Sequence, residues 1–279
     1  RLLLWVFFCY ITSMPHGKPL LSVIVPTFGQ EKTIEATIRT LDRGLTKLSI
    51  PYEIIVVVDG RIDETFERAK KLAHDHIRVV GYVHNRGKGY AVRYGMARAR
   101  GDVIAFIDAG GDILTSSIGI ALEHFRWQDA DIVVASKRHP LSKVRYPYSR
   151  KILSRGYQLV VRILFGLNIS DTQVGLKVYR RQVLEDVLPR LLVKRFAFDI
   201  EILAVAHHLG YTRIFEAPVQ LDFTGVSSIT TTNFWSIALR MLWDTVAVFY
   251  RLRIRQYYDA TNKRKWIFDP ELNFRVNIG

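Results

Sequence analysis

Two aspartates stand directly after short apolar runs, in positions where both could contribute to one site. Asp59 follows the run 54–58, and Asp108 follows the run 103–107. A carboxylate that ends a buried strand lies at the mouth of a parallel sheet, which is where such sheets bind their ligands. A single aspartate there would more simply be a loop residue or a helix cap. Two of them at successive strand ends favour a binding site.

The loop that follows Asp108 has the composition of a site for a hard cation. Asp112 comes four residues later, and the intervening Ala109, Gly110 and Gly111 are small enough to let both carboxylates approach one ion. Hard divalent cations take one or two protein carboxylates and complete their shell with phosphate oxygens and water. Asp108 and Asp112 are therefore the predicted metal ligands, and Mg²⁺ or Mn²⁺ is the predicted cofactor.

A glycine-rich segment, residues 85–89, lies between a predicted strand and a predicted helix. Its glycines let the backbone approach a phosphate, and Arg86 or Lys88 can supply positive charge. The segment is neither a Walker A sequence nor part of a GxGxxG dinucleotide fingerprint. The eight histidines show no HExxH or comparable metal spacing. Each histidine is therefore expected singly, on the surface or in the core.

These residues need a sheet to position them, and the hydrophobic pattern supplies one. Short runs rich in β-branched residues indicate buried strands, and they cover residues 20–26, 52–59, 77–83, 103–108 and 131–135. Segments with helical spacing lie between them. Strand and helix therefore alternate, which predicts an α/β fold with a doubly wound, mostly parallel sheet.

The second half of the chain is more basic and more amphipathic. The pattern predicts a helix over 150–167, a strand over 174–179 and a helix over 199–209 that Gly210 ends. The first of these helices carries Lys151, Arg155 and Arg162 at roughly helical spacing, and it fits a surface helix as well as a membrane-facing one. The aromatic segment 234–252 contains charged residues, so it is expected to lie at an interface or to pack, and not to span a membrane.

Composition narrows the class of protein further. The chain has 279 residues, 49% of them hydrophobic and 24% charged, which is typical of globular proteins. A formal charge of +14 points to an anionic partner: nucleic acid, phospholipid or a sugar nucleotide. The single cysteine, Cys9, excludes an internal disulfide. The apolar run 2–11 is shorter than the roughly 20 residues of a membrane span, and it fits either the end of a longer segment or a signal peptide.

Five motifs occur in one order along the chain, at residues 22–28, 58–60, 85–89, 106–112 and 171–177. Together they resemble family-2 glycosyltransferases with the GT-A fold. The subgroup to which the chain is most similar is the polyprenyl-phosphate sugar synthases, which include dolichyl-phosphate glucosyl- and mannosyltransferases. The likeness runs from about residue 20 to residue 253, and the segments 171–177 and 195–199 are its most subgroup-specific parts.

The resemblance implies a role for each matching residue. It places Pro26, Thr27 and Asp59 in the pocket for the nucleotide base and ribose, and Lys88 near the base or the diphosphate. It also assigns Asp108 to the nucleotide sugar and to catalysis as well as to the metal.

Two departures from the family pattern bear on these roles. Gly110 stands where the second aspartate of the usual Asp-x-Asp metal motif would be, so Asp112 would have to act as the further ligand. Val58 stands where many relatives have the first of two consecutive aspartates, which leaves Asp59 alone for the base contact.

The reaction that the resemblance implies is the inverting transfer of a hexose from UDP-glucose or GDP-mannose to a polyprenyl (dolichyl) phosphate. The acceptor phosphate would be held by Lys137, Arg138 and Arg145 from a basic loop, although a solvated loop is the simpler interpretation for at least half of its charges. Asp171 would lie beside the sugar and acceptor and act in catalysis; its alternative is a turn-forming aspartate.

The sequence leaves other functions open. One alternative is a glycosyltransferase with a non-lipid acceptor, and another is a catalytically weakened protein that only binds a nucleotide sugar, which Gly110 makes conceivable. Nucleic acid is not an expected partner, because no recognised nucleic-acid motif occurs. The expected location is the cytoplasmic face of an anionic membrane, and the oligomeric state is left open. The expected organisation is an apolar segment (1–19), a GT-A domain (20–230) with C-terminal membrane-interface helices, and an amphipathic, aromatic and basic segment (231–279).

Overall fold

A computed structural model of the protein describes residues 20–110, 113–142, 148–194, 197–221, 234–259 and 266–277. Two of the predicted site residues, Asp112 and Arg145, lie outside these described residues, as does the apolar segment 1–19. The other predicted site residues are all described.

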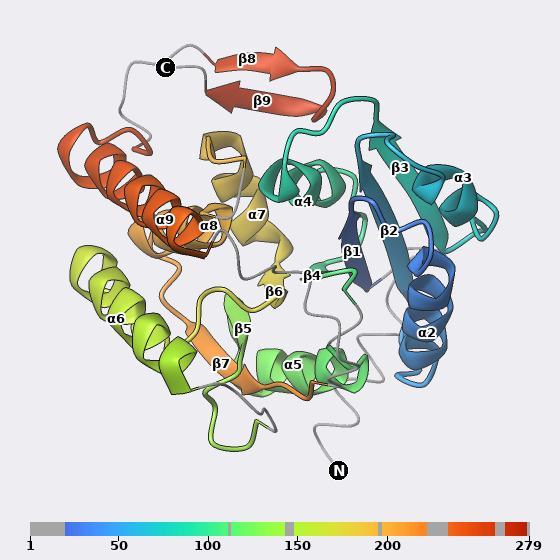
Figure 1. The fold of residues 1–279 in the computed structure, drawn as a ribbon, viewed down its shortest axis with the longest axis horizontal. Coiled ribbons are helices and arrows are strands. Elements are labelled where there is room, and N and C mark those ends of the chain that lie inside the picture. Colours follow the sequence, from blue (N-terminus) through green and yellow to red (C-terminus); the bar gives the residue numbers. More distant parts are fainter. Residues whose placement is uncertain are drawn as a thin grey trace.

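Seven strands of the described chain form one mixed sheet (Figure 1). Its order is β3-β2-β1-β4-β6-β5-β7. The strands are β1 (Leu21–Thr27), β2 (Tyr52–Asp59), β3 (Ile77–Tyr82), β4 (Val103–Ile107), β5 (Ile132–Ser136), β6 (Leu176–Arg180) and β7 (Ile214–Pro218). Neighbouring strands are parallel except that β6 runs antiparallel to both β4 and β5. The predicted α/β class with a mostly parallel sheet is confirmed.

The reversed strand β6 matters for the site. Because β6 is antiparallel to its neighbours, its first residue, Leu176, pairs with Ile107 at the carboxyl end of β4. The residues just before Leu176 therefore lie at the same edge of the sheet as the residues that follow β4 and β5. The motif 171–177 is brought in this way to the edge where Asp108 was expected.

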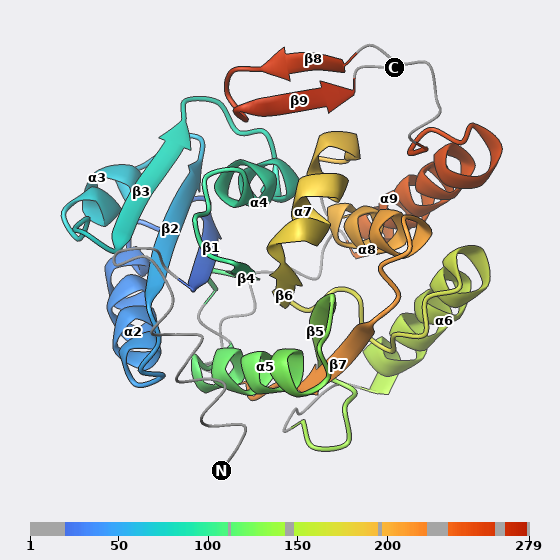
Figure 2. The same ribbon diagram turned by 180° about the vertical axis from the view of Figure 1, so that it is seen from behind.

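Helices cover both faces of the sheet, as Figures 1 and 2 show from opposite sides. One face packs against α2 (Ile34–Thr46), α3 (Thr65–Lys70) and α5 (Ser116–Trp127). The other face packs against α4 (Lys88–Met96), α7 (Arg181–Val187) and α8 (Phe198–His208), with α6 (Tyr148–Phe165) and α9 (Phe234–Phe249) beyond them. Short turns of 3₁₀-helix, η1 (Leu188–Arg190), and of π-helix, η3 (Tyr250–Ile254), follow α7 and α9.

The central strands are apolar on both faces because each face has its own core. Ile54 and Val56 belong to the core under α2, α3 and α5, whereas Ile55 and Val57 belong to the core under α4, α7 and α8. All four side chains are fully buried. This is why the strand reads as a continuous apolar run and not as an alternation. Each such side chain contributes about 1.5–3 kcal/mol on burial.

The C-terminal part of the chain packs back onto the sheet domain. Val248, Leu252 and Tyr258 join the core that lies under α4, α7 and α8. Beyond them, β8 (Trp266–Asp269) and β9 (Phe274–Asn277) form an antiparallel hairpin, drawn in red beside α4 in Figures 1 and 2. The sequence predicted only a basic and aromatic segment here, because short exposed strands have no strong hydrophobic period.

Among the described residues, no helix combines the length and the apolar character that a membrane span requires.

Candidate active site

Four charged side chains form a connected chain at the carboxyl end of β4. The Lys88 ammonium lies 2.9 Å from Asp108 Oδ1 and 3.8 Å from Asp199 Oδ2. Asp199 Oδ1 in turn lies 2.5 Å from the ammonium of Lys177. Lys88 begins α4, Asp199 lies in the first turn of α8, and Lys177 lies on β6. The sequence predicted Lys88 and Asp108 for this site, and the structure brings them into direct contact.

The alternation of charges in this chain stabilises its members. Burial alone would lower the pKa of Lys88, but the carboxylates of Asp108 and Asp199 outweigh it and hold that pKa above its usual value. Lys88 is therefore a cation at neutral pH. Lys177 is fully buried, and burial together with the nearby charge of Lys88 lowers its pKa although Asp199 opposes the shift. Removing Asp199 would leave the fully buried charge of Lys177 unpaired, which commonly costs about 3–5 kcal/mol.

Gly175 gives the Asp108 carboxylate its space. A Cβ atom on Gly175 would lie 2.1 Å from Asp108 Oδ2, far inside any contact distance. The same glycine accepts a 2.8 Å hydrogen bond from the Asp108 N–H through its carbonyl. The motif 171–177 therefore has a glycine at position 175 because the backbone just before β6 lies directly against the aspartate that follows β4.

Asp59 fixes the start of the glycine-rich segment. Its Oδ1 accepts a hydrogen bond from the Arg86 N–H at 2.7 Å, and its Oδ2 accepts one from the Gly87 N–H at 3.0 Å. Gly87 caps α4 with a φ of 97°, a conformation that favours glycine. Asp59 is only 3% exposed. Its carboxylate is thus used within the protein to hold the segment, and a direct contact with a nucleotide base stays a prediction.

The other residues expected around the base lie beside Asp59. Thr27 ends β1 and is buried, with its hydroxyl donating a 3.3 Å hydrogen bond to the Val57 carbonyl on β2. Pro26, one residue earlier, is half-buried. Both residues stand at the carboxyl end of β1, next to the end of β2. Their role in binding a nucleotide also stays a prediction.

Asp171 lies buried in the loop before β6. Its carboxylate accepts hydrogen bonds from the N–H groups of Gln173 at 3.2 Å and Lys137 at 3.3 Å. Burial raises the pKa of this carboxyl, against the opposing effects of these hydrogen bonds and of the charges of Lys137 and Lys177. The structure therefore joins Asp171 to Lys137, which follows β5 as the sequence predicted.

Glu216 on β7 holds the Asp171 loop from the other side. One of its carboxylate oxygens accepts hydrogen bonds from the Asp171 N–H at 3.2 Å and from the Ser170 N–H at 3.0 Å. The Ser170 hydroxyl donates to the same carboxylate at 2.7 Å. Sequence reasoning missed Glu216, and the signal was a single carboxylate inside an otherwise apolar strand.

The basic residues expected for an acceptor phosphate are only partly described. Lys137 and Arg138 follow β5 and are half-buried, and the Arg138 N–H donates a 3.2 Å hydrogen bond to the Ser136 hydroxyl. Arg145 lies outside the described residues. Sequence reasoning gave no role to Lys177 or Asp199, although both lie in motifs that it used. A lysine inside a strand was the available signal for Lys177.

Comparisons with known proteins identify the family of the chain. Residues 22–188 match the family described as "Glycosyl transferase family 2". A dolichyl-phosphate beta-glucosyltransferase from Drosophila melanogaster is 31% identical over 264 residues, which cover 88% of this chain and 79% of the relative. The enzyme of that name from Homo sapiens is 31% identical over 236 residues, covering 77% and 71%.

Solved structures show the same fold. Glucosyl-3-phosphoglycerate synthase from Mycobacterium tuberculosis, in complex with Mn²⁺, UDP and glucosyl-3-phosphoglycerate, matches with a TM-score of 0.60 at 17% identity, over 90% of this chain and 84% of that one. A mannosyltransferase from Pyrobaculum calidifontis, in complex with GDP-mannose and Mn²⁺, matches with a TM-score of 0.56 at 19% identity, over 91% and 71%. The chain therefore belongs to glycosyl transferase family 2, has the GT-A fold, and is homologous to dolichyl-phosphate beta-glucosyltransferases.

Proposed function

We propose that the protein transfers glucose from UDP-glucose to a polyprenyl phosphate of the dolichyl type, with inversion at the anomeric carbon. The observation that carries this proposal is the similarity, over most of the chain, to proteins named dolichyl-phosphate beta-glucosyltransferase. The site supports it, because a lysine, an exposed carboxylate and a buried carboxylate gather at the sheet edge where GT-A proteins would bind the donor.

The donor end of the site would be Lys88 and Asp108. The Asp108 side chain is 41% exposed, so its carboxylate can reach a ligand, and a hard carboxylate oxygen suits Mg²⁺ or Mn²⁺. Asp108, with Asp112, would hold that ion, which supplies positive charge opposite the leaving diphosphate. Lys88 would add a fixed cation at the same place. Preorganised charge of this kind lowers the barrier because it costs no reorganisation during the reaction.

The acceptor end would be Asp171 and the basic residues near it. A phosphate oxygen is already anionic near neutral pH, so the acceptor needs positioning more than it needs a strong general base. Lys137, Arg138 and Arg145 would hold the phosphate. Asp171 would stabilise the positive charge that develops on the sugar in an oxocarbenium-like transition state. Glu216 would keep Asp171 in place through the backbone of its loop.

The apolar surface of α6 and α9 supports a lipid acceptor. The two helices lie side by side in Figures 1 and 2, and the hydroxyls of Tyr157 and Thr245 join them at 2.9 Å. Each helix exposes large apolar side chains at helical spacing, namely Leu159 and Ile163 on α6 and Leu239, Leu242, Trp243 and Val246 on α9. We call these six residues the α6/α9 apolar surface.

Helix α6, which carries part of this surface, also contacts the Asp171 loop through a buried side chain. Gln158 on α6 donates a 3.0 Å hydrogen bond to the hydroxyl of Thr172, the residue that follows Asp171. A lipid whose chain lies in a bilayer against the α6/α9 apolar surface would present its phosphate on the side of the Asp171 loop. Peripheral attachment to the cytoplasmic face of an anionic membrane is therefore part of the proposal.

The proposal is tested by a panel of donors and acceptors. UDP-glucose and GDP-mannose would each be incubated with dolichyl phosphate or with the soluble acceptor 3-phosphoglycerate, in Mn²⁺ or Mg²⁺, and products identified by mass. We expect a hexosyl lipid from UDP-glucose. Transfer only to 3-phosphoglycerate would indicate a soluble acceptor, and nucleotide binding without any transfer would indicate a catalytically weakened binding protein; either result would contradict the proposal.

A further inference from the structure

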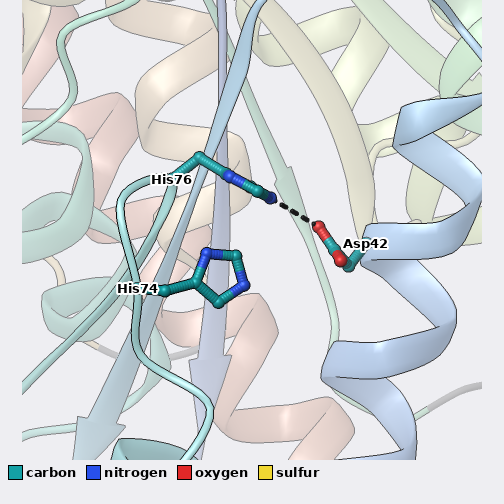
Figure 3. Close-up of side chains that lie close together, drawn as sticks. All are labelled: Asp42, His74 and His76. Atoms are coloured by element: carbon teal, nitrogen blue, oxygen red, sulfur yellow. Dashed lines mark hydrogen bonds and ion pairs between the residues drawn. The ribbon is translucent and has the colours of Figure 1, made fainter.

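A second group of potential ligands lies at the opposite end of the sheet from the candidate active site. Asp42 belongs to the last turns of α2, and His74 and His76 belong to the turn that leads into β3 (Figure 3). Their ligand atoms all lie within 4.8 Å of one another. In the part of the chain that the structure describes, no other three such residues meet this distance. Sequence spacing could not reveal the group, because Asp42 is far from the histidines along the chain.

Hydrogen bonds orient two of the three side chains, and the group is accessible. His76 Nε2 lies 3.0 Å from Asp42 Oδ1, and the Tyr52 hydroxyl donates to the same carboxylate oxygen at 2.7 Å. A hydrogen bond from a second residue is what orients ligating carboxylates in metal sites. His74 is exposed, and together with Asp42 it lines an open cavity of about 320 Å³. Solvent and ions can therefore reach the group.

The donor set selects a class of metal. Imidazole nitrogens suit Zn²⁺ and its neighbours among the transition metals better than they suit Mg²⁺, and one carboxylate supplies the negative charge. A tetrahedral zinc ion binds its ligand atoms at about 2.0–2.2 Å, so the three ligand atoms must come closer together than the 4.8 Å limit within which they now lie. The exposed His74 ring is the side chain that can move to achieve this. We propose that Asp42, His74 and His76 bind a Zn²⁺-type ion, with water as the fourth ligand.

The position of this site predicts its effect. It joins α2 to the start of β3 at the amino ends of the strands, whereas the candidate active site lies at their carboxyl ends. A bound ion would therefore stabilise the fold and leave the transfer reaction unchanged, since an ion that binds only the native state adds to stability. Acidification would weaken the binding because imidazole binds a metal only when neutral.

The test is a Zn²⁺ titration of the full chain, stripped of metal, by calorimetry. The protein would carry Asp108→Asn so that the candidate active site does not compete. His74→Gln and His76→Gln would be compared with His207→Gln, which changes a half-buried histidine in the last turn of α8. We expect one saturable site that weakens at least about tenfold in the first two variants only. Co²⁺ should give the strong visible absorption of four-coordinate geometry. Absence of saturable binding, or equal affinity in all three variants, would overturn the proposal. If His76→Gln fails to fold, the affinity of His74→Gln alone tests the proposal, because His74 is exposed and its replacement should not disturb folding.

A different observation concerns the C-terminal hairpin. Glu271, in the turn between β8 and β9, forms an ion pair with the Arg86 guanidinium, and the Tyr90 hydroxyl donates to the same carboxylate at 2.8 Å. Arg98 donates to the Glu271 carbonyl. Leu272 beside it is buried. The hairpin therefore holds one side chain of the glycine-rich segment, one side chain of α4 and one side chain, Arg98, that follows α4.

These contacts reach the candidate donor site through Arg86. The backbone N–H of Arg86 is bound by Asp59, and its side chain is bound by Glu271. Two residues later, Lys88 pairs with Asp108. The hairpin thus contributes to fixing the segment that presents Lys88, although Glu271 itself does not touch Lys88 or Asp108.

We infer that Glu271 is a positioning residue of the donor site, an inference that rests on the proposed function. The Arg86–Glu271 pair is partly exposed, with 36% and 47% of the two side chains accessible, and exposed pairs contribute little to stability. Losing Glu271 should therefore release the glycine-rich segment while the domain stays folded. The donor would bind less well, and the transfer step would change less.

The test compares Glu271→Ala with Glu185→Ala, which removes an exposed glutamate paired with Arg181 on α7. For Glu271→Ala we expect the donor KM and the Kd of UDP to rise about fivefold while kcat stays nearly constant. Amide exchange over residues 85–90 should become faster. Glu271→Gln should restore part of the UDP affinity. The control should resemble the wild type. Unchanged UDP affinity together with unchanged exchange would overturn the inference. If the wild type binds no nucleotide, the proposed function fails, and the exchange rates alone decide whether Glu271 holds the segment.

Discussion

At the scale of single residues, the contact between Gly175 and Asp108 is central to the proposed site. We predict that Gly175→Ala strongly reduces transfer, because the new methyl would lie 2.1 Å from Asp108 Oδ2 and must displace the carboxylate. We expect kcat to fall and the affinity for Mn²⁺, which calorimetry can measure, to fall with it. Gly156 offers a control, since a Cβ there meets nothing within 4 Å. Normal Mn²⁺ affinity in Gly175→Ala would show that Asp108 is not a ligand.

Asp171 allows a prediction that separates function from stability. Burial raises the pKa of this carboxyl above the ordinary value of about 3.9. At a pH above that raised pKa, the ionised carboxylate therefore lowers the free energy of unfolding. The cost disappears below the ordinary value, where both states are protonated. Asp171→Asn should therefore lower kcat at least about a hundredfold, while its Tm at pH 7 equals or exceeds that of the wild type. Thermal melts at pH 7 and pH 4 check the sign. A large loss of Tm at pH 7 would make Asp171 a structural residue.

At the scale of elements, the α6/α9 apolar surface is expected to bind membranes. We predict that the pair of changes Leu239→Ser and Trp243→Ser weakens flotation with anionic vesicles about tenfold or more, since each large apolar side chain contributes about 1.5–3 kcal/mol on burial. Trp127→Ser with Leu141→Ser is the matched control, because these side chains are 84% and 73% exposed elsewhere on the surface. Binding should also fall with salt. An equal loss in both pairs would argue against this surface.

The elements were largely predictable from sequence, but their directions were not. Runs of β-branched residues mark β2 and β4 to within a residue, because a strand buried on both faces must be apolar throughout. The same pattern predicts β6 but says nothing about its direction, which depends on packing across the sheet. That reversal is what brings Gly175 against Asp108. Local patterns also could not reveal the hairpin or its link from Glu271 to Arg86, because those partners are remote in sequence.

The residues of the candidate site likewise differ in whether the sequence could reveal them. Asp108 was predicted because a carboxylate directly after an apolar run stands out in a sequence, Lys88 because it lies in a glycine-rich segment, and Asp171 because of the family resemblance. Lys177 and Glu216 were missed because they lie inside strands, where a charge reads as an interruption until its partner is known. Only the fold shows that each is paired, the first with Asp199 and the second with the backbone of the Asp171 loop.

At the scale of the whole molecule, the sheet edge and the α6/α9 apolar surface make one arrangement. In the proposed function the donor would bind at Lys88 and Asp108, which are in contact, and the acceptor would bind at Asp171, whose loop is joined to α6 by Gln158. A soluble acceptor would give the exposed apolar side chains of α6 and α9 no role. A lipid acceptor accounts for both features, because its phosphate and its hydrocarbon chain need different surroundings.

The most direct measurement is the structure of the product made from UDP-α-glucose and dolichyl phosphate in Mn²⁺, by mass and by the anomeric coupling in its NMR spectrum. We expect a β-linked glucosyl phospholipid from the wild type. We also expect that Asp108→Asn forms almost none and that excess chelator abolishes the wild-type reaction. Glucose recovered only on a soluble acceptor, an α-linked lipid, or full activity in chelator would contradict the proposed function.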